Sequence, residues 1–421
     1  MSHRSRVVRF APVLAALLGL ALPLAALADE AQLDAIAERV AELRELPPLP
    51  GIDNAFITAD ELRARLPAML DEDYPPADAE AESRAYAALG LIPPGTDLRQ
   101  LYEHLLGEQV AGYYDPRTDQ MFVIGDGGAL GPEEEFTYAH EVVHALQDAN
   151  LDLGDVMEST QTANDDEALA VAALFEGDAT AASFAYLLTD PSLAAAVAFA
   201  APVDSAEFDT APAAIAISLV FPYLAGQEFV SALYDEGGWQ AVNDAYARLP
   251  VSTAQIMHPE KYLANDAPTP IALPDPVAAL GPDWSLVNED TLGELGVALL
   301  LANLQPGQGL DAFGGIALPI PARNAAAGWD GDRFALWSDG DQDVLILRSA
   351  WDSESDARAF ARALQARTQE RFGGTYATTA PADLTMTAPD IATRIVFDGS
   401  EVFYAQAPTP ELAARALEAM R

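Results

Sequence analysis

Two of the five histidines in this chain lie in one stretch that decides its fold: Thr137-Tyr138-Ala139-His140-Glu141-Val142-Val143-His144-Ala145-Leu146. Residues four apart lie on one face of an α-helix, so the His140 and His144 imidazoles can reach the same point. Neutral imidazole is a preferred zinc ligand, and Glu141 lies where it can contact a metal-bound water. The pattern therefore predicts a zinc-binding helix of the kind that hydrolases use. The alternative is a helix whose histidines only form hydrogen bonds in a core.

The residues before this motif are typical of a helix start. Gly131-Pro132 places a proline in the first turn, and the three glutamates at 133–135 meet the positive end of the helix dipole. Apolar residues surround the two histidines and would pack against the rest of the protein: Ala139, Val142, Val143 and Leu146. We therefore expect a buried motif helix.

Residues 1–28 are expected to be a cleaved signal peptide. Three arginines precede an apolar run over residues 11–24, and Ala26-Leu27-Ala28 fits a cleavage site. The run is short for a membrane span, and no later segment fits better. We expect a soluble periplasmic or secreted protein with no integral membrane segment after cleavage.

The charge of the chain disfavours one class of partner, and its lack of cysteine excludes several kinds of site. The formal net charge is −43, which argues against binding to nucleic acid. The absence of cysteine excludes disulfides, thiolate zinc ligands and a lipid-anchored cysteine. The sequence does not indicate an oligomeric state.

A third zinc ligand is expected on a later helix, which Asn164 should cap and which should run to about residue 188. Its small-residue face carries Glu176, and a carboxylate buried there is costly unless it is paired or bound to a metal. Glu176 is thus the expected ligand, with Asp178 as a partner for a ligand histidine. The alternatives are a solvent-facing Glu176, or Glu167 as the ligand, although the helix cap already accounts for Glu167.

Residues 109–124 predict a β-hairpin directly before the motif helix. A turn-rich segment, 115–119, separates residues 109–114 from the β-prone residues 121–124. The hairpin either covers the helix or offers an edge strand to an extended peptide substrate. Its position directly before the motif helix favours the interpretation as an edge strand for a peptide substrate.

The motif followed by a glutamate on a later helix resembles the gluzincin group of zinc metallopeptidases. The resemblance implies a zincin-like fold, with His140, His144 and Glu176 as zinc ligands and Glu141 as the general base. The gluzincin glutamate more often lies in an ExxxD pattern, and Thr180 fills the last place here. The chain also resembles a secreted, largely uncharacterised bacterial family in several segments: Gly112-Tyr113-Tyr114-Asp115-Pro116, Tyr138-Ala139-His140-Glu141, His144-Ala145-Leu146-Gln147-Asp148, Glu176-Gly177-Asp178-Ala179 and Ser252-Thr253-Ala254-Gln255-Ile256-Met257-His258-Pro259-Glu260.

Two other zinc classes fit the sequence less well. Metzincins need a glycine and a third histidine at the positions that Gln147 and Asn150 hold. Deformylase-like sites use a cysteine ligand, which this chain lacks. Both classes are disfavoured.

A short turn that Ser252-Thr253 should cap carries His258 and Tyr262. His258 is either a plain turn residue before Pro259 or a donor that stabilises the oxyanion, a group that the motif helix cannot supply. Tyr262 is the other candidate for this role.

The expected fold class is α+β. A mainly helical zincin-like domain should span residues 29–305, followed by a linker rich in glycine, proline and alanine at 306–332. Residues 333–421 should form a small α+β domain with strand–strand–helix repeated twice. This domain carries no catalytic signature, so a packing or substrate-presenting role is expected.

These observations together favour an exported peptidase with Zn²⁺ as its cofactor and a peptide or protein as its substrate. Glu141 would take a proton from the metal-activated water. The alternative is a non-catalytic zincin-fold scaffold or binding protein of the cell envelope. Intact Glu141 argues against the scaffold, because zinc binding does not require it.

Overall fold

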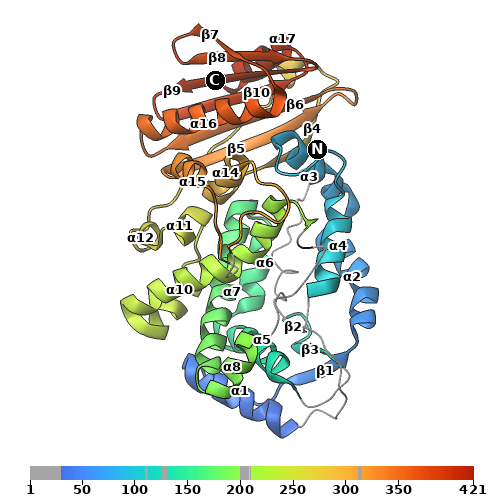
Figure 1. The fold of residues 1–421 in the computed structure, drawn as a ribbon, viewed down its shortest axis with the longest axis vertical. Coiled ribbons are helices and arrows are strands. Elements are labelled where there is room, and N and C mark those ends of the chain that lie inside the picture. The colour runs from blue at the N-terminus through green and yellow to red at the C-terminus, as the bar shows by residue number, and fades with distance from the viewer. Residues whose placement is uncertain (1–29, 110–111, 126–129, 200–207, 209, 312–314) are drawn as a thin grey trace.

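The computed structural model is an α+β protein with two sheets (Figure 1). A mainly helical part carries a three-stranded sheet, and a seven-stranded antiparallel sheet forms the C-terminal part. The α+β class expected from the sequence is confirmed. The expected signal peptide lies outside the residues that the structure describes, which are 30–109, 112–125, 130–199, 208, 210–311 and 315–421.

The helices of the N-terminal part begin where local signals predict. The Thr58 hydroxyl accepts a hydrogen bond from the backbone N–H of Glu61 at 3.2 Å, and the Glu61 carboxylate accepts one from the backbone N–H of Thr58 at 2.7 Å. This capping box starts the second helix, as the sequence predicts. The four helices are α1 (Glu30–Arg44), α2 (Ala59–Asp73), α3 (Pro76–Leu89) and α4 (Leu98–Gln109).

The small sheet contains the predicted hairpin and one strand that the sequence did not predict. Strands β2 (Gly112–Asp115) and β3 (Gln120–Ile124) pair antiparallel, and β1 (Asp53–Ile57) pairs parallel with β3. The strand order β1-β3-β2 leaves β2 at an edge, where it packs against the motif helix α5 (Pro132–Leu151). The structure therefore has an edge strand beside the motif, and its pairing with a peptide remains a prediction.

The central layer consists of long, apolar helices. The Asn164 side chain accepts a hydrogen bond from the backbone N–H of Glu167 at 2.9 Å, which confirms the predicted start of α7 (Asp165–Leu187). Helix α10 (Ala213–Ala247) packs along α7, and its backbone breaks at the expected Gly237-Gly238. Shorter helices complete this region: α6 (Leu153–Thr160), α8 (Pro191–Phe199), α11 (Thr253–Met257), α12 (Pro259–Leu263) and α13 (Val277–Leu280).

Helices α7 and α10 are long and apolar enough to cross a membrane by length and composition. In the structure, 78% of the 18-residue apolar stretch of α7 and 61% of that of α10 are buried inside the molecule. Core helices of soluble proteins have the same length and composition, so these two helices are weak evidence for a membrane span. Their apolar faces are explained by packing against each other and against neighbouring helices.

Two glycines let α7 and α10 approach until their backbones touch. A Cβ atom on Gly177 would lie 2.2 Å from the carbonyl carbon of Gly226, and one on Gly226 would lie 2.1 Å from the carbonyl oxygen of Ala173. Neither position has room for a side chain. The small-residue face of α7 is therefore the contact surface for α10.

Replacing Gly226 with alanine is expected to lower the free energy of unfolding by about 1–3 kcal/mol, because the new methyl group overpacks a backbone contact. The matched control is Gly107→Ala in α4, where the nearest atoms belong to the flexible Arg63 and Leu66 side chains. Urea unfolding monitored by circular dichroism measures both variants. Equal midpoints for Gly226→Ala and the wild type would show that the two helices do not meet this closely.

The C-terminal sheet has the strand order β4-β5-β6-β10-β9-β8-β7. The two predicted strand–strand–helix units adjoin at the sheet centre, where β6 pairs with β10. Three strands of this sheet, β4, β7 and β8, were not predicted from the sequence. The elements are β4 (Ser285–Asp290), α14 (Gly293–Ala302), α15 (Ile320–Ala326), β5 (Trp329–Ser338), β6 (Asp343–Trp351), α16 (Glu354–Phe372), β7 (Tyr376–Ala380), β8 (Asp383–Ala388), β9 (Ile391–Asp398), β10 (Glu401–Ala407) and α17 (Pro410–Met420).

Helices α16 and α17 cover opposite faces of this sheet. Alternate residues of β6 separate the two cores: Leu345 and Leu347 pack with α16, whereas Val344 and Ile346 pack with α17. The α16 side is continuous with the core of the helical part. Strand β4 lies before the expected linker at 306–332, and that linker contains α15. The sheet thus begins earlier in the chain than residue 333, where the second domain was predicted to begin.

Candidate metal centre

Three side chains from two helices meet at one point. The His140 and His144 side chains come from α5, and Glu176 comes from the middle of α7. The Nε2 atoms of the two histidines are 3.2 Å apart, and Glu176 Oε2 lies 3.1 Å from His140 Nε2 and 3.4 Å from His144 Nε2. These three atoms are called the donor triangle below. The expected convergence of Glu176 with both imidazoles is present.

The size of the donor triangle fits a tetrahedral zinc ion. Zinc bonds of about 2.0–2.1 Å at tetrahedral angles place neighbouring donor atoms about 3.3–3.4 Å apart. The second carboxylate oxygen of Glu176, Oε1, is buried and has no hydrogen-bond partner among the described residues. Such an oxygen is costly to bury, and a metal ion at the triangle would compensate its carboxylate.

Glu141 lies beside the triangle without belonging to it. Its side chain is buried, and its Oε2 accepts a hydrogen bond from the backbone N–H of Tyr114 on β2 at 3.0 Å. The nearest donor atoms of Glu141 and the two histidines all lie within 4.8 Å of one another. Burial raises the pKa of Glu141 to about 8, despite the opposing effect of His144. The motif glutamate is thus held between the edge strand and the histidines.

Burial and charge pairing act in opposite directions on the donor triangle. Burial lowers the pKa of His140 more than its hydrogen bond to Glu176 raises it. Burial also opposes the charge on His144, but Glu176 outweighs it and raises the pKa of His144 to about 9. The same pairing lowers the pKa of Glu176 against the effect of burial. Since a metal needs neutral imidazole, its binding here would release a proton from His144.

The partner of His144 differs from the one expected. The sequence suggested Asp178, but the amide oxygen of Gln147 lies 2.8 Å from His144 Nδ1, and Asp178 contacts the other end of that amide at 3.1 Å. The sequence pattern had identified Gln147 only as the residue at a position where metzincins have glycine. The spacing of three residues on α5 was the available signal for this contact.

An aromatic side chain beside His140 was also missed. The ring centroid of Tyr223 on α10 lies 5.9 Å from that of His140, and Tyr223 is buried. No sequence pattern links the two residues, because their contact depends on how α10 packs against the other helices.

The structure pairs His258 with a residue outside the donor triangle, so its role as an oxyanion donor stays a prediction beside the plain turn residue. Its Nε2 pairs with Glu294 Oε1 at 2.9 Å. The neighbouring Leu295 N–H donates to Thr253, whose own N–H donates to Asp166 in the first turn of α7. Asp166 precedes Glu176 by ten residues, which corresponds to about 15 Å along α7.

The contacts of Tyr262 also lie outside the donor triangle, and its role as an oxyanion donor stays a prediction. Its hydroxyl donates to the backbone carbonyl of Arg248 at 2.7 Å, and the Arg248 guanidinium lies 4.0 Å from the centre of its ring. Its edge packs against Phe229. Tyr262 therefore holds the C-terminal end of α10 in place.

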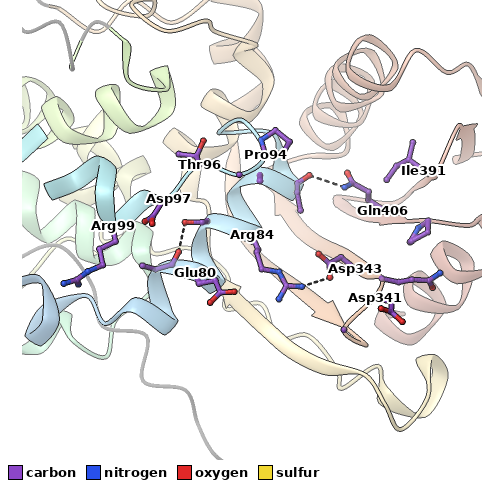
Figure 2. A pocket seen from close by; sticks show the side chains of 18 of the residues that line it. Glu80, Arg84, Pro94, Thr96, Asp97, Arg99, Asp341, Asp343, Ile391 and Gln406 are labelled. Carbon is purple, nitrogen blue, oxygen red and sulfur yellow. Dashed lines mark hydrogen bonds and ion pairs between the residues drawn. The ribbon is translucent and has the colours of Figure 1, made fainter. Parts of the chain in front are cut away.

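A groove lies elsewhere on the molecule, between the helical part and the C-terminal sheet. It has a volume of about 890 Å³ and separates the α3–α4 region from the β5–β6 turn (Figure 2). Arg84 and Asp343 form an ion pair of 2.7 Å across it. No member of the donor triangle lines this groove, so its size says nothing about the metal centre.

Comparison with known proteins finds a match for only part of the chain. A family model described as a domain of unknown function (DUF8575) matches residues 284–417. No curated protein and no solved structure matches the chain. The matched residues begin one position before β4 and take in the whole C-terminal sheet, while the donor triangle lies outside them.

Proposed function

We propose that this protein is an exported zinc-dependent peptidase with a zincin-like catalytic part. The observation that carries the proposal is the donor triangle of His140, His144 and Glu176, with donor atoms 3.1–3.4 Å apart. Three protein ligands of this kind leave a fourth position for water, which is typical of catalytic rather than structural zinc. The sequence resemblance to gluzincins supports the same ligand set.

Glu141 is the proposed general base. Zinc at the triangle would polarise the scissile carbonyl and lower the pKa of a bound water. Glu141 would take a proton from the attacking water and would deliver it to the leaving amine. The backbone N–H of Tyr114 holds one oxygen of this carboxylate, which fixes the direction of the other.

Strand β2 is the proposed binding edge for an extended peptide. It is the edge strand next to α5, and the Tyr114 N–H connects it directly to the proposed base. A peptide that pairs with such an edge would pass close to Glu141. Peptides are therefore favoured over small esters or amides as substrates.

A second candidate is a scaffold in which zinc is purely structural. The observation in its favour is burial, because the side chains of His144 and Glu176 are only 2% and 1% exposed. Closed structural zinc sites are normally completed by a fourth protein ligand, usually a cysteine. This chain has no cysteine, so the catalytic proposal is preferred.

The proposal is tested by the metal content and activity of the purified protein. We expect about one zinc per chain, and hydrolysis of an unfolded protein substrate that stops on chelation and returns with added zinc. His144→Ala should abolish zinc binding, whereas His104→Ala, on the exposed side of α4, should retain it. Wild-type protein without bound zinc after zinc loading would contradict the proposal.

A further inference from the structure

A directed chain of hydrogen bonds leads away from His144. The amide oxygen of Gln147 can only accept, so the His144 Nδ1 atom 2.8 Å away must carry the proton. The nitrogen of His144 that faces the donor triangle is then Nε2. Gln147 therefore selects which nitrogen of His144 is left to bind a metal.

The orientation of the Gln147 amide is itself fixed. Its nitrogen donates to the backbone carbonyl of Phe175 at 2.9 Å and to Asp178 Oδ2 at 3.1 Å. Both partners are pure acceptors, so a flipped amide would bring its oxygen against two other oxygens. The amide therefore has one allowed orientation as long as Asp178 stays in place.

Asp178 is held by a fully buried arginine from the first helix. Arg44 on α1 donates from Nε to Asp178 Oδ1 at 2.5 Å and from Nη2 to Oδ2 at 3.0 Å. Its side chain has no exposed surface, its Nη2 also donates to Asn243, and its guanidinium lies 4.3 Å from the centre of the Trp239 ring. This two-point contact fixes the plane of the carboxylate, which a single donor would not do.

We propose that Gln147 and Arg44 are positioning residues for the metal centre. Gln147 sets the tautomer of His144, and Arg44 keeps Gln147 oriented through Asp178. The inference rests on the proposed function, because it treats His144 as a zinc ligand. It assigns to α1 a role in metal affinity, although α1 contributes no atom to the donor triangle.

Two variants test the series of hydrogen bonds from Arg44 to His144 without altering the residues of the donor triangle. Gln147→Leu removes the acceptor at His144 with little change in volume. Arg44→Lys keeps the buried positive charge and removes the two-point contact with Asp178. It therefore tests the same series of hydrogen bonds even if Gln147→Leu does not fold. The matched control is Gln255→Leu, since Gln255 is a buried glutamine with its own two bonds, from the Val251 N–H at 2.9 Å and to the Asp266 carbonyl at 2.8 Å.

The measurements are zinc affinity, by competition with a chelator, and the histidine resonances of the ¹⁵N-histidine-labelled, zinc-loaded protein. Partners of ligand histidines are typically worth about 10–100-fold in metal affinity. We expect Gln147→Leu to raise the zinc Kd by about that factor and to lose the protected Nδ1–H signal of His144. Arg44→Lys should also raise the zinc Kd and weaken the Nδ1–H signal of His144, but by less than Gln147→Leu does. Gln255→Leu should keep the wild-type Kd and signal, even if it unfolds more easily.

The opposite results are equally clear. A wild-type Kd and an intact Nδ1–H signal in folded Gln147→Leu would overturn the inference and leave the proposed function standing. An equal rise of the Kd in Gln255→Leu would also overturn it, because the effect would then reflect general stability. Wild-type protein that takes up no zinc would overturn both proposals together.

Discussion

Glu141→Gln is expected to keep its zinc and its fold and to lose peptide hydrolysis by about 10²–10⁴-fold, the usual contribution of a general base. Glutamine has nearly the same shape and can still accept the hydrogen bond from the Tyr114 N–H that now holds the glutamate at 3.0 Å. It cannot take a proton from water. The loss should therefore appear in kcat, with zinc content unchanged.

The control for this experiment is Glu133→Gln in the first turn of α5, which changes a carboxylate on the same helix away from the histidines. Initial rates on an unfolded protein substrate and zinc per chain are measured for all three proteins. If the wild type and Glu141→Gln hydrolyse every peptide pool at the same background rate, the structural-zinc scaffold becomes the better account of the site.

Glu176→Gln is expected to lose stoichiometric zinc and, with it, all hydrolysis. Both imidazoles must be neutral to bind zinc, so the carboxylate is the only ligand of the donor triangle that brings a negative charge to the metal, and a neutral amide is a poor replacement for it. The change preserves volume on a face where α10 packs closely. A stable fold with no bound zinc is therefore the expected result, measured by metal analysis and circular dichroism.

The competing ligand supplies the control for Glu176→Gln. Glu167 lies in the first turn of the same helix, where its backbone N–H donates a hydrogen bond to the side chain of the capping residue Asn164. Glu167→Gln should keep zinc and activity. Zinc retained in Glu176→Gln and lost in Glu167→Gln would remove this protein from the gluzincin pattern.

Helix boundaries and the hairpin were predictable because their signals are local. Gly131-Pro132 and the glutamates after it mark the start of α5, and Asn164 caps α7, since each uses groups within one turn of the helix end. The glycine pair 237–238 breaks α10 for an equally local reason, because its backbone angles are non-helical.

The missed strands depend on partners that are distant in the sequence. Residues 53–57 become a strand by pairing with residues 120–124, and they show no alternating pattern of their own. Strand β7 is largely exposed and β8 is mostly half-buried, so their residues carry little of the apolar alternation that predicts a strand. Strand β4 lies in a segment that the sequence assigned to the first domain.

The sequence by itself determined the spacing of the two imidazoles and the place of Glu141 next to them, because helical periodicity fixes which residues share a face. It also pointed to Glu176, since a carboxylate on a small-residue face needs a partner. Only the tertiary structure decided that Arg44, 134 residues before Asp178, binds the Asp178 carboxylate and so completes the series of hydrogen bonds to His144. A buried charge is compensated by whichever helix packs against it, and that choice depends on the fold as a whole.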